Sequence, residues 1–288
     1  MKFFVKFIIL SLISFSLCSR EIGETEITTE DGIEVFQNEK FYLLKKNVKI
    51  ESDNFTLSAD DVKIDFDKSL YDITNLYAKG EVDFFSKEFG ISSNGDILNF
   101  RVKIEKLRVE GQGSQLLTKD VEMFSDGFIE VNNQNGDFLL KGLNSKLINE
   151  SIVIIANSID GNFVDKVDKK EITFLKGKNS KLVNENIIIK AETINGNFSE
   201  KANEKEITYL EVIDKNISYV KNNDTEMYAK KINFDYDTSI IELIDDVIII
   251  RNEEKITGDY GTLDTRNNSY KIKSINQNKV KVIIQNNE

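Results

Sequence analysis

The sequence predicts a nearly all-β protein made of stacked antiparallel strand pairs. Three observations predict this class. A ten-residue pattern of alternating apolar and polar residues has four clear copies, and a segment of 32 residues recurs almost literally 35 residues later. Beyond the first 20 residues, no stretch of 12 or more keeps a helical period. Alternation with period two is typical of strands, because successive side chains leave opposite faces of the pleat.

Residues 1–18 are expected to form a secretory signal peptide. Lys2 and Lys6 precede an apolar run of 11 residues, and small residues follow at 16, 18 and 19. This order is typical of a cleaved export signal, whereas a membrane-spanning helix needs about 20 apolar residues. A retained anchor is the alternative. The chain from about 24 to 286 shows no compositional break, so we expect a single elongated domain.

The composition excludes several classes of function. There is no His, and Cys18, the one cysteine, lies at the expected cleavage site. His and Cys are the usual ligands of zinc and copper, so we expect no metal site and no cofactor. Without Lys2 and Lys6 the chain has 36 basic and 49 acidic residues, a net charge of −13. Nucleic acid requires a basic surface, so it is not an expected partner.

The ten-residue pattern indicates a bent strand. Its clear copies are 57–66, 154–163, 189–198 and 227–236. In each copy the alternation skips one place after an alanine, as it does after Ala59. An extra residue of this kind is the sequence signature of a β-bulge, which bends the strand and restores its apolar side. The same bend in four strands predicts a repeating sheet.

The repeats predict about seven stacked units. Residues 144–175 and 179–210 align without a gap and are identical at 19 of 32 positions. Each copy has two apolar runs separated by polar turn residues, so one unit is two strands and two turns. With weaker copies, units are predicted to begin near 57, 91, 129, 154, 189, 227 and 256. Second strands are predicted to begin near Val48, Val82, Val121, Val247 and Val280.

The alternating apolar positions are predicted to face the space between two sheets or the inside of a flattened roll. With one strand of each unit in each sheet, the stack would be roughly 34 Å long. The sheets then either interdigitate into a dry core or splay around an apolar groove. The last apolar segment, 280–284, is predicted to be an open edge strand, which a partner strand could extend.

Four motifs resemble the OstA-like family of lipopolysaccharide-transport proteins. They are Ala-Asp-x-Val-x-Ile-Asp-Phe-Asp at 59–67, Ala-Lys-Gly-Glu-Val at 78–82, Ala-Lys-Lys-Ile-Asn-Phe-Asp-Tyr-Asp at 229–237 and Ile-Thr-Gly-Asp-Tyr-Gly-Thr-Leu-Asp at 256–264. Each motif is short, and their recurrence carries the resemblance. It implies an elongated twisted β-jellyroll in the periplasm, whose open apolar groove holds the acyl chains of lipopolysaccharide or a similar amphiphile.

The resemblance also implies partners and candidate groove residues. The partners are an inner-membrane transporter component and an outer-membrane translocon, and copies could associate end to end as a homo-oligomer. The candidate lipid-groove residues are the inward positions of the pattern: Leu57, Ala59, Val62, Ile64, Phe66, Ile154, Ile159, Phe163, Ile189, Ile194, Phe198, Ile232, Phe234 and Tyr236.

Three other functions compete with the conducting bridge. A membrane-tethered component of the same transporter shares the fold, and a structural or adhesive surface protein would have the same repeats around a dry core. The third is an enzyme, such as a polysaccharide-cleaving β-helix, using the carboxylate pairs Asp60 and Asp61 or Asp235 and Asp237. These pairs recur at equivalent repeat positions, which is typical of solvated turns. No enzyme activity and no catalytic residue are therefore expected.

Overall fold

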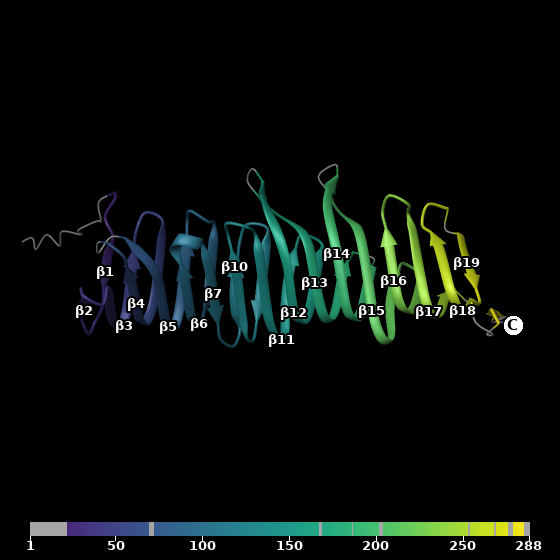
Figure 1. Ribbon diagram of the computed structural model, residues 1–288, viewed down its shortest axis with the longest axis horizontal. Coiled ribbons are helices and arrows are strands. Elements are labelled where there is room, and N and C mark those ends of the chain that lie inside the picture. The colour runs from purple at the N-terminus through teal and green to yellow at the C-terminus, as the bar shows by residue number, and fades with distance from the viewer. Residues whose placement is uncertain are drawn as a thin grey trace, which may run out of the picture.

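The computed structural model describes residues 22–68, 72–166, 169–185, 187–201, 204–252, 254–267, 269–275 and 279–284. The predicted signal peptide lies outside these residues. The described chain forms twenty strands, all paired antiparallel, and one short 3-10 helix at Val102–Ile104. The all-β prediction is thereby confirmed. Figure 1 shows the strands side by side along one long axis, with the first and last strands at opposite ends.

The strands have the following bounds. They are β1 Glu26–Thr28, β2 Ile33–Phe36, β3 Phe41–Glu51, β4 Phe55–Phe66, β5 Ile73–Ser86, β6 Ile91–Arg101, β7 Lys106–Glu110, β8 Ser114–Leu117, β9 Val121–Ser125, β10 Phe128–Asn132, β11 Asp137–Asn149, β12 Ile152–Lys166, β13 Lys169–Asn184, β14 Ile187–Lys201, β15 Glu204–Asn222, β16 Thr225–Asp235, β17 Ile240–Arg251, β18 Glu254–Asp264, β19 Ser269–Lys273 and β20 Lys281–Ile284.

Each long strand bends near its middle and belongs to two arms of one folded sheet. The strand β3, for example, pairs with β1 through one half and with β2 through the other. We call the arm that contains β1, β8, β9 and β20 the first arm, and the arm that contains β2, β7, β10 and β19 the second arm. The remaining strands contribute one half to each arm. The bends join the arms along one side, and the hairpin turns form two rims along the other.

One row of paired residues crosses the whole first arm. In order it contains Ile27, Ile50, Leu57, Phe84, Ser93, Leu116, Met123, Leu147, Ile154, Leu182, Ile189, Val220, Met227, Ile249, Ile256 and Val282. Sixteen described strands thus lie in this arm, and at about 4.8 Å per strand the stack is roughly 70 Å long. The expected 34 Å is wrong because every unit contributes two strand segments, and not one, to each arm.

The row also corrects two predicted unit starts. Seven strand pairs lie between the end strands, as the repeats predict, but the residues equivalent to Leu57 are Ser93 and Met123 in place of 91 and 129. Residues 129–138 form β10, a turn and the start of β11. The bend of that unit falls earlier, at Gly127, where an added Cβ would lie 2.1 Å from the Lys141 carbonyl oxygen.

Two devices produce the bends. The predicted skip after the alanine is confirmed, because the register of β4 against β5 shifts between Ser58 and Asp61. The partner strands bend through two consecutive residues with positive φ, such as Lys46 at 64° and Asn47 at 51°. The valine that follows them, Val48, was predicted to begin a strand but lies in the middle of β3. Val82 and Val247 occupy the same position in β5 and β17.

Candidate functional site

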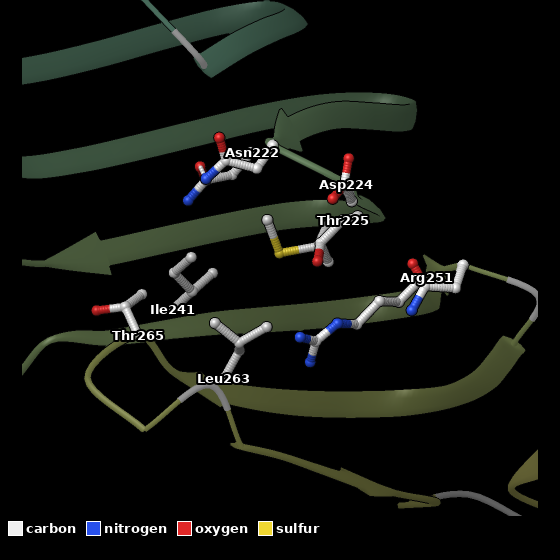
Figure 2. A pocket seen from close by; sticks show the side chains of 10 residues that line it. Asn222, Asp224, Thr225, Ile241, Arg251, Leu263 and Thr265 are labelled. Atoms are coloured by element: carbon white, nitrogen blue, oxygen red, sulfur yellow. Dashed lines mark hydrogen bonds between the residues drawn. The ribbon is translucent and has the colours of Figure 1, made fainter.

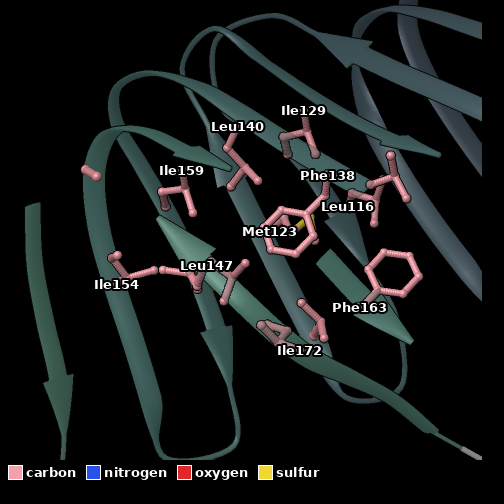
Figure 3. Packing of buried hydrophobic residues seen from close by; sticks show 14 of the residues in the cluster. Leu116, Met123, Ile129, Phe138, Leu140, Leu147, Ile154, Ile159, Phe163 and Ile172 are labelled. Carbon is pink, nitrogen blue, oxygen red and sulfur yellow. The ribbon is translucent and has the colours of Figure 1, made fainter. Parts of the chain in front are cut away.

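The inward side chains of the two arms form one continuous apolar cluster. It extends from Leu44 on β3 to Leu263 on β18. Near the middle of the molecule, Leu116 and Met123 of the first arm lie close to Phe138 and Phe163 of the second (Figure 3). The rings of Phe138 and Phe163 stack with centroids 6.2 Å apart. Both rings belong to the second arm, so this stack packs side chains of that arm against each other.

A polar contact joins the two rims at the same level. The backbone amide of Lys170, in the β12–β13 hairpin of the second arm, donates to the Asp120 carboxylate at 3.1 Å. Asp120 lies in the β8–β9 turn on the rim of the first arm. Its carbonyl oxygen accepts a hydrogen bond from the Asn149 side chain at 2.8 Å. The middle of the roll is therefore held closed at its mouth.

Nearer the C-terminus, residues of both arms line an apolar cavity of about 330 Å³, which we call the rim cavity. Ile187 and Val220 line it from the first arm, and Leu210 and Phe234 from the second. Its full lining is Asn184, Ile187, Ile207, Leu210, Val220, Asn222, Ile232, Phe234, Tyr236, Ile241 and Thr265.

A second cavity of about 310 Å³ continues from the rim cavity. The two share Asn222, Ile241 and Thr265 in their linings. The second cavity is more polar, and the Arg251 side chain extends into it toward Leu263 (Figure 2). Together the two cavities form an apolar space with a polar border that includes both Arg251 and Asp224.

The structure places the predicted groove residues in two environments. Twelve of the fourteen are buried in the core, and Phe234 and Tyr236 are half-buried. Ile232, Phe234 and Tyr236 line the rim cavity. The other eleven pack elsewhere in the interior, so their contact with lipid stays a prediction.

Sequence reasoning missed most of the cavity lining. Ile187, Ile207, Leu210, Val220 and Ile241 lie outside the copies of the ten-residue pattern. Four of them lie on β15 and β17, the second strands of their repeat units, and Ile187 is the first residue of β14. The alternation Leu210-x-Val212 in β15 was a signal that could have identified part of the lining.

The charged groups are concentrated on the outside. On the rim of the second arm, the ammonium groups of Lys103 and Lys40 lie 3.2 and 3.4 Å from the Asp67 carboxylate. Both contacts lower the pKa of Asp67, and the contact with Lys103 is the larger cause. The proposed carboxylate pair Asp60 and Asp61 is exposed at a bend. Among the described residues, no group of three or more His, Cys, Asp or Glu is arranged to hold a metal, and no helix is long and apolar enough to span a membrane.

The fold defines an elongated, all-β roll with an apolar interior. No family model matches the sequence, and no curated protein matches it either. Among solved structures, the chain is similar to the crystal structure of LptH, the LptA homologous periplasmic component of the lipopolysaccharide transport device from Pseudomonas aeruginosa. The identity is 13% and the TM-score 0.36, over 47% of this chain and 95% of that chain.

Proposed function

We propose that this protein is a periplasmic carrier of lipopolysaccharide or a related amphiphile, which holds acyl chains between the two arms. The rim cavity is the observation that carries the proposal. Its volume of about 330 Å³ has room for roughly ten groups of methylene size. Each buried methylene would contribute about 0.8 kcal/mol, so a single acyl chain would bind reversibly.

The charge of the chain determines where the head group would lie. The full sequence has a net charge of −11, which repels lipid phosphates. The head group would therefore stay in solvent with divalent counter-ions, beside Arg251 at the border of the second cavity. Affinity would come from burial of the acyl chains.

The proposal includes export through a cleaved signal peptide, a single domain over about 24–286, and a bridge between inner and outer membranes. The partners would be an inner-membrane transporter component and an outer-membrane translocon. Both ends of the stack support such a bridge, because end strands expose apolar side chains. Val35 on β2 is 47% exposed, and Val282 on β20 is 53% exposed.

Photo-crosslinking of the purified chain to lipopolysaccharide tests the carrier function. We expect an adduct when benzoylphenylalanine replaces Phe234, which lines the rim cavity. The matched control is Tyr77, which is exposed on the outer face of β5 and should give none. Circular dichroism would establish that both variants fold. Equal labelling at both positions, or none at Phe234, would refute the carrier function.

A structural protein with a dry core is the second candidate, favoured by the stacked Phe138 and Phe163. The substitution Val220→Phe, which adds volume at the rim cavity, separates the two functions. A carrier should lose the adduct at Phe234 without losing its fold. A structural protein should show no adduct before or after the substitution.

A further inference from the structure

A hollow of about 870 Å³ lies on the outside of the roll, across the bends of β11 to β15. Its walls arise because two strands have long bends. The register of β11 shifts between Lys141 and Ser145, and that of β15 between Ile213 and Ser218. Between them, β13 bends through the single residue Asn179. The walls are four strand spacings apart, roughly 19 Å. We call this site the outer hollow.

The outer hollow exposes apolar side chains from both walls and the floor. Leu143 on the β11 wall is 73% exposed, Ile217 on the β15 wall is 39% exposed, and Ile155 on the floor is 40% exposed. Single exposed apolar residues are common on proteins, but three around one concavity mark an interaction site. The rim cavity lies inside the roll, so the outer hollow is a separate surface.

The floor of the outer hollow also carries adjacent positive charges. Lys181 on β13 and Lys190 on β14 are direct cross-strand partners. Like charges in this position repel each other, and a carboxylate from a partner would relieve the repulsion. The acidic groups of the hollow are engaged locally. The Glu192 carboxylate forms an ion pair of 2.8 Å with Lys215. The Asp214 carboxylate accepts a hydrogen bond of 3.0 Å from the backbone amide of Glu192.

The backbone of the floor restricts what kind of peptide can bind. The strands β12, β13 and β14 are each paired with a neighbour on both sides. An incoming segment cannot add to them as a strand, so it must satisfy its own backbone hydrogen bonds. A helix does so, and its diameter of about 10–12 Å fits between walls roughly 19 Å apart.

We propose that the outer hollow docks an acidic amphipathic α-helix of a partner protein. The apolar side of the helix would contact Leu143, Ile155 and Ile217, and its carboxylates would reach Lys181 and Lys190. This interaction does not depend on the proposed carrier function.

Binding of designed peptides to the purified chain tests the proposal. The probe is a fluorescein-labelled helical peptide of about 18 residues, with leucines along one side and glutamates elsewhere. The matched peptides replace glutamate by lysine, or contain two central prolines that prevent a helix. By fluorescence anisotropy, the leucine–glutamate peptide should bind at least about tenfold more tightly than either matched peptide.

Substitutions in the chain locate the binding site. The double change K181E/K190E should reverse the preference, so that the leucine–lysine peptide binds more tightly. Leu143→Asn should weaken the binding of the leucine–glutamate peptide by about tenfold. Because Leu143 is exposed, this change should leave the thermal unfolding curve unaltered. The control Phe85→Asn alters another exposed side chain outside the hollow and should leave binding unchanged.

Three results would overturn the proposal. The first is equal binding of the leucine–glutamate and leucine–lysine peptides. The second is binding of vesicles of phosphatidylglycerol and phosphatidylethanolamine that K181E/K190E abolishes, which would assign the surface to a membrane. The third is a dimer in sedimentation velocity that Leu143→Asn dissociates, which would assign it to a second copy of the chain.

Discussion

The backbone amide of Lys170 donates a hydrogen bond of 3.1 Å to the Asp120 carboxylate across the mouth of the roll. The contact is possible because β12 continues three residues beyond Phe163, which ends the ten-residue pattern. The longer hairpin thus reaches the opposite rim. Directly inside, Phe138 and Phe163 stack. Lys170 joins the two features, because its ammonium group lies over the Phe163 ring, 4.4 Å from the ring centroid.

We expect Asp120→Ala to open the middle of the roll. Removing the acceptor of a charge-assisted hydrogen bond should lower the free energy of unfolding by about 1–2 kcal/mol. The Lys170 amide should exchange its hydrogen faster, as measured by mass spectrometry. Asp224→Ala is the control, because Asp224 is exposed at the β15–β16 turn of the same rim. Unchanged exchange at Lys170 in Asp120→Ala would show that the contact does not hold the arms.

The two near-identical repeats allow a matched test of interior packing. A Cβ at Gly161 would lie 2.4 Å from the Phe138 ring and 2.5 Å from the Phe174 carbonyl oxygen. At the equivalent Gly196, the nearest atom would be in the Phe198 ring at 3.1 Å. A backbone oxygen cannot move aside as a ring can. Gly161→Ala should therefore lower the free energy of unfolding by about 1–3 kcal/mol, and Gly196→Ala by clearly less.

Urea unfolding of the two variants measures this difference. The midpoint should fall much further for Gly161→Ala than for Gly196→Ala, with similar slopes. Equal midpoints would mean that the two repeats do not pack differently around their glycines.

On the outer face, Tyr228 should ionise only at strongly alkaline pH. Burial, followed by the hydrogen bond of 2.9 Å to Glu226, raises the pKa of Tyr228 to about 12. The neutral phenol is thus favoured in the folded state. Its contribution to stability is complete below the unfolded pKa of about 10 and is lost as the pH rises toward 12.

Ultraviolet titration of the phenolates checks this shift. Tyr228→Phe should remove one group that ionises near pH 12, and Glu226→Gln should move that group to lower pH. Glu242→Gln is the control, because Glu242 accepts a hydrogen bond of 2.8 Å from the hydroxyl of Tyr260 and none from that of Tyr228. If Glu226→Gln leaves the late transition in place, Glu226 does not support the neutral phenol.

The sequence predicted the features that depend on local alternation. The strands, the bend after Ala59 and the inward direction of residues such as Leu57 and Ile64 follow from period two and one skipped place. The seven units followed from repetition of that signal. The start at 129 was wrong because Gly127 places the bend earlier, where the alternation is weak.

The features that sequence did not predict depend on contacts between distant segments. The membership of a long strand in both arms is visible only from its neighbours, as when β3 pairs with β1 through one half and with β2 through the other. Lys170 and Asp120 are 50 residues apart, and neither belongs to the ten-residue pattern. The rim cavity is lined by residues of five strands and of the turns between them, so no single strand determines it. The long bends at 142–144 and 214–217, where the registers of β11 and β15 shift, were not predicted from the sequence.

The end strands allow a test of end-to-end association. Val282 is the last member of the row that begins at Ile27, so a second copy would continue the row by placing its Ile27 beside Val282. An inward charge on an edge strand prevents such an addition, because the next strand would bury it. Val282→Lys should therefore abolish concentration-dependent association in sedimentation velocity.

The neighbouring position on the same strand is the matched control. Ile283 pairs with Lys255 on the outer face of β18, so Ile283→Lys adds the same charge where a following strand would leave it in solvent. This variant should associate as the unsubstituted chain does. If Ile283→Lys dissociates the oligomer as fully as Val282→Lys, net charge and not continuation of the inward row controls association. If the unsubstituted chain is monomeric at all concentrations, the exposed ends require a different protein, and the proposed transporter and translocon components become the partners to test.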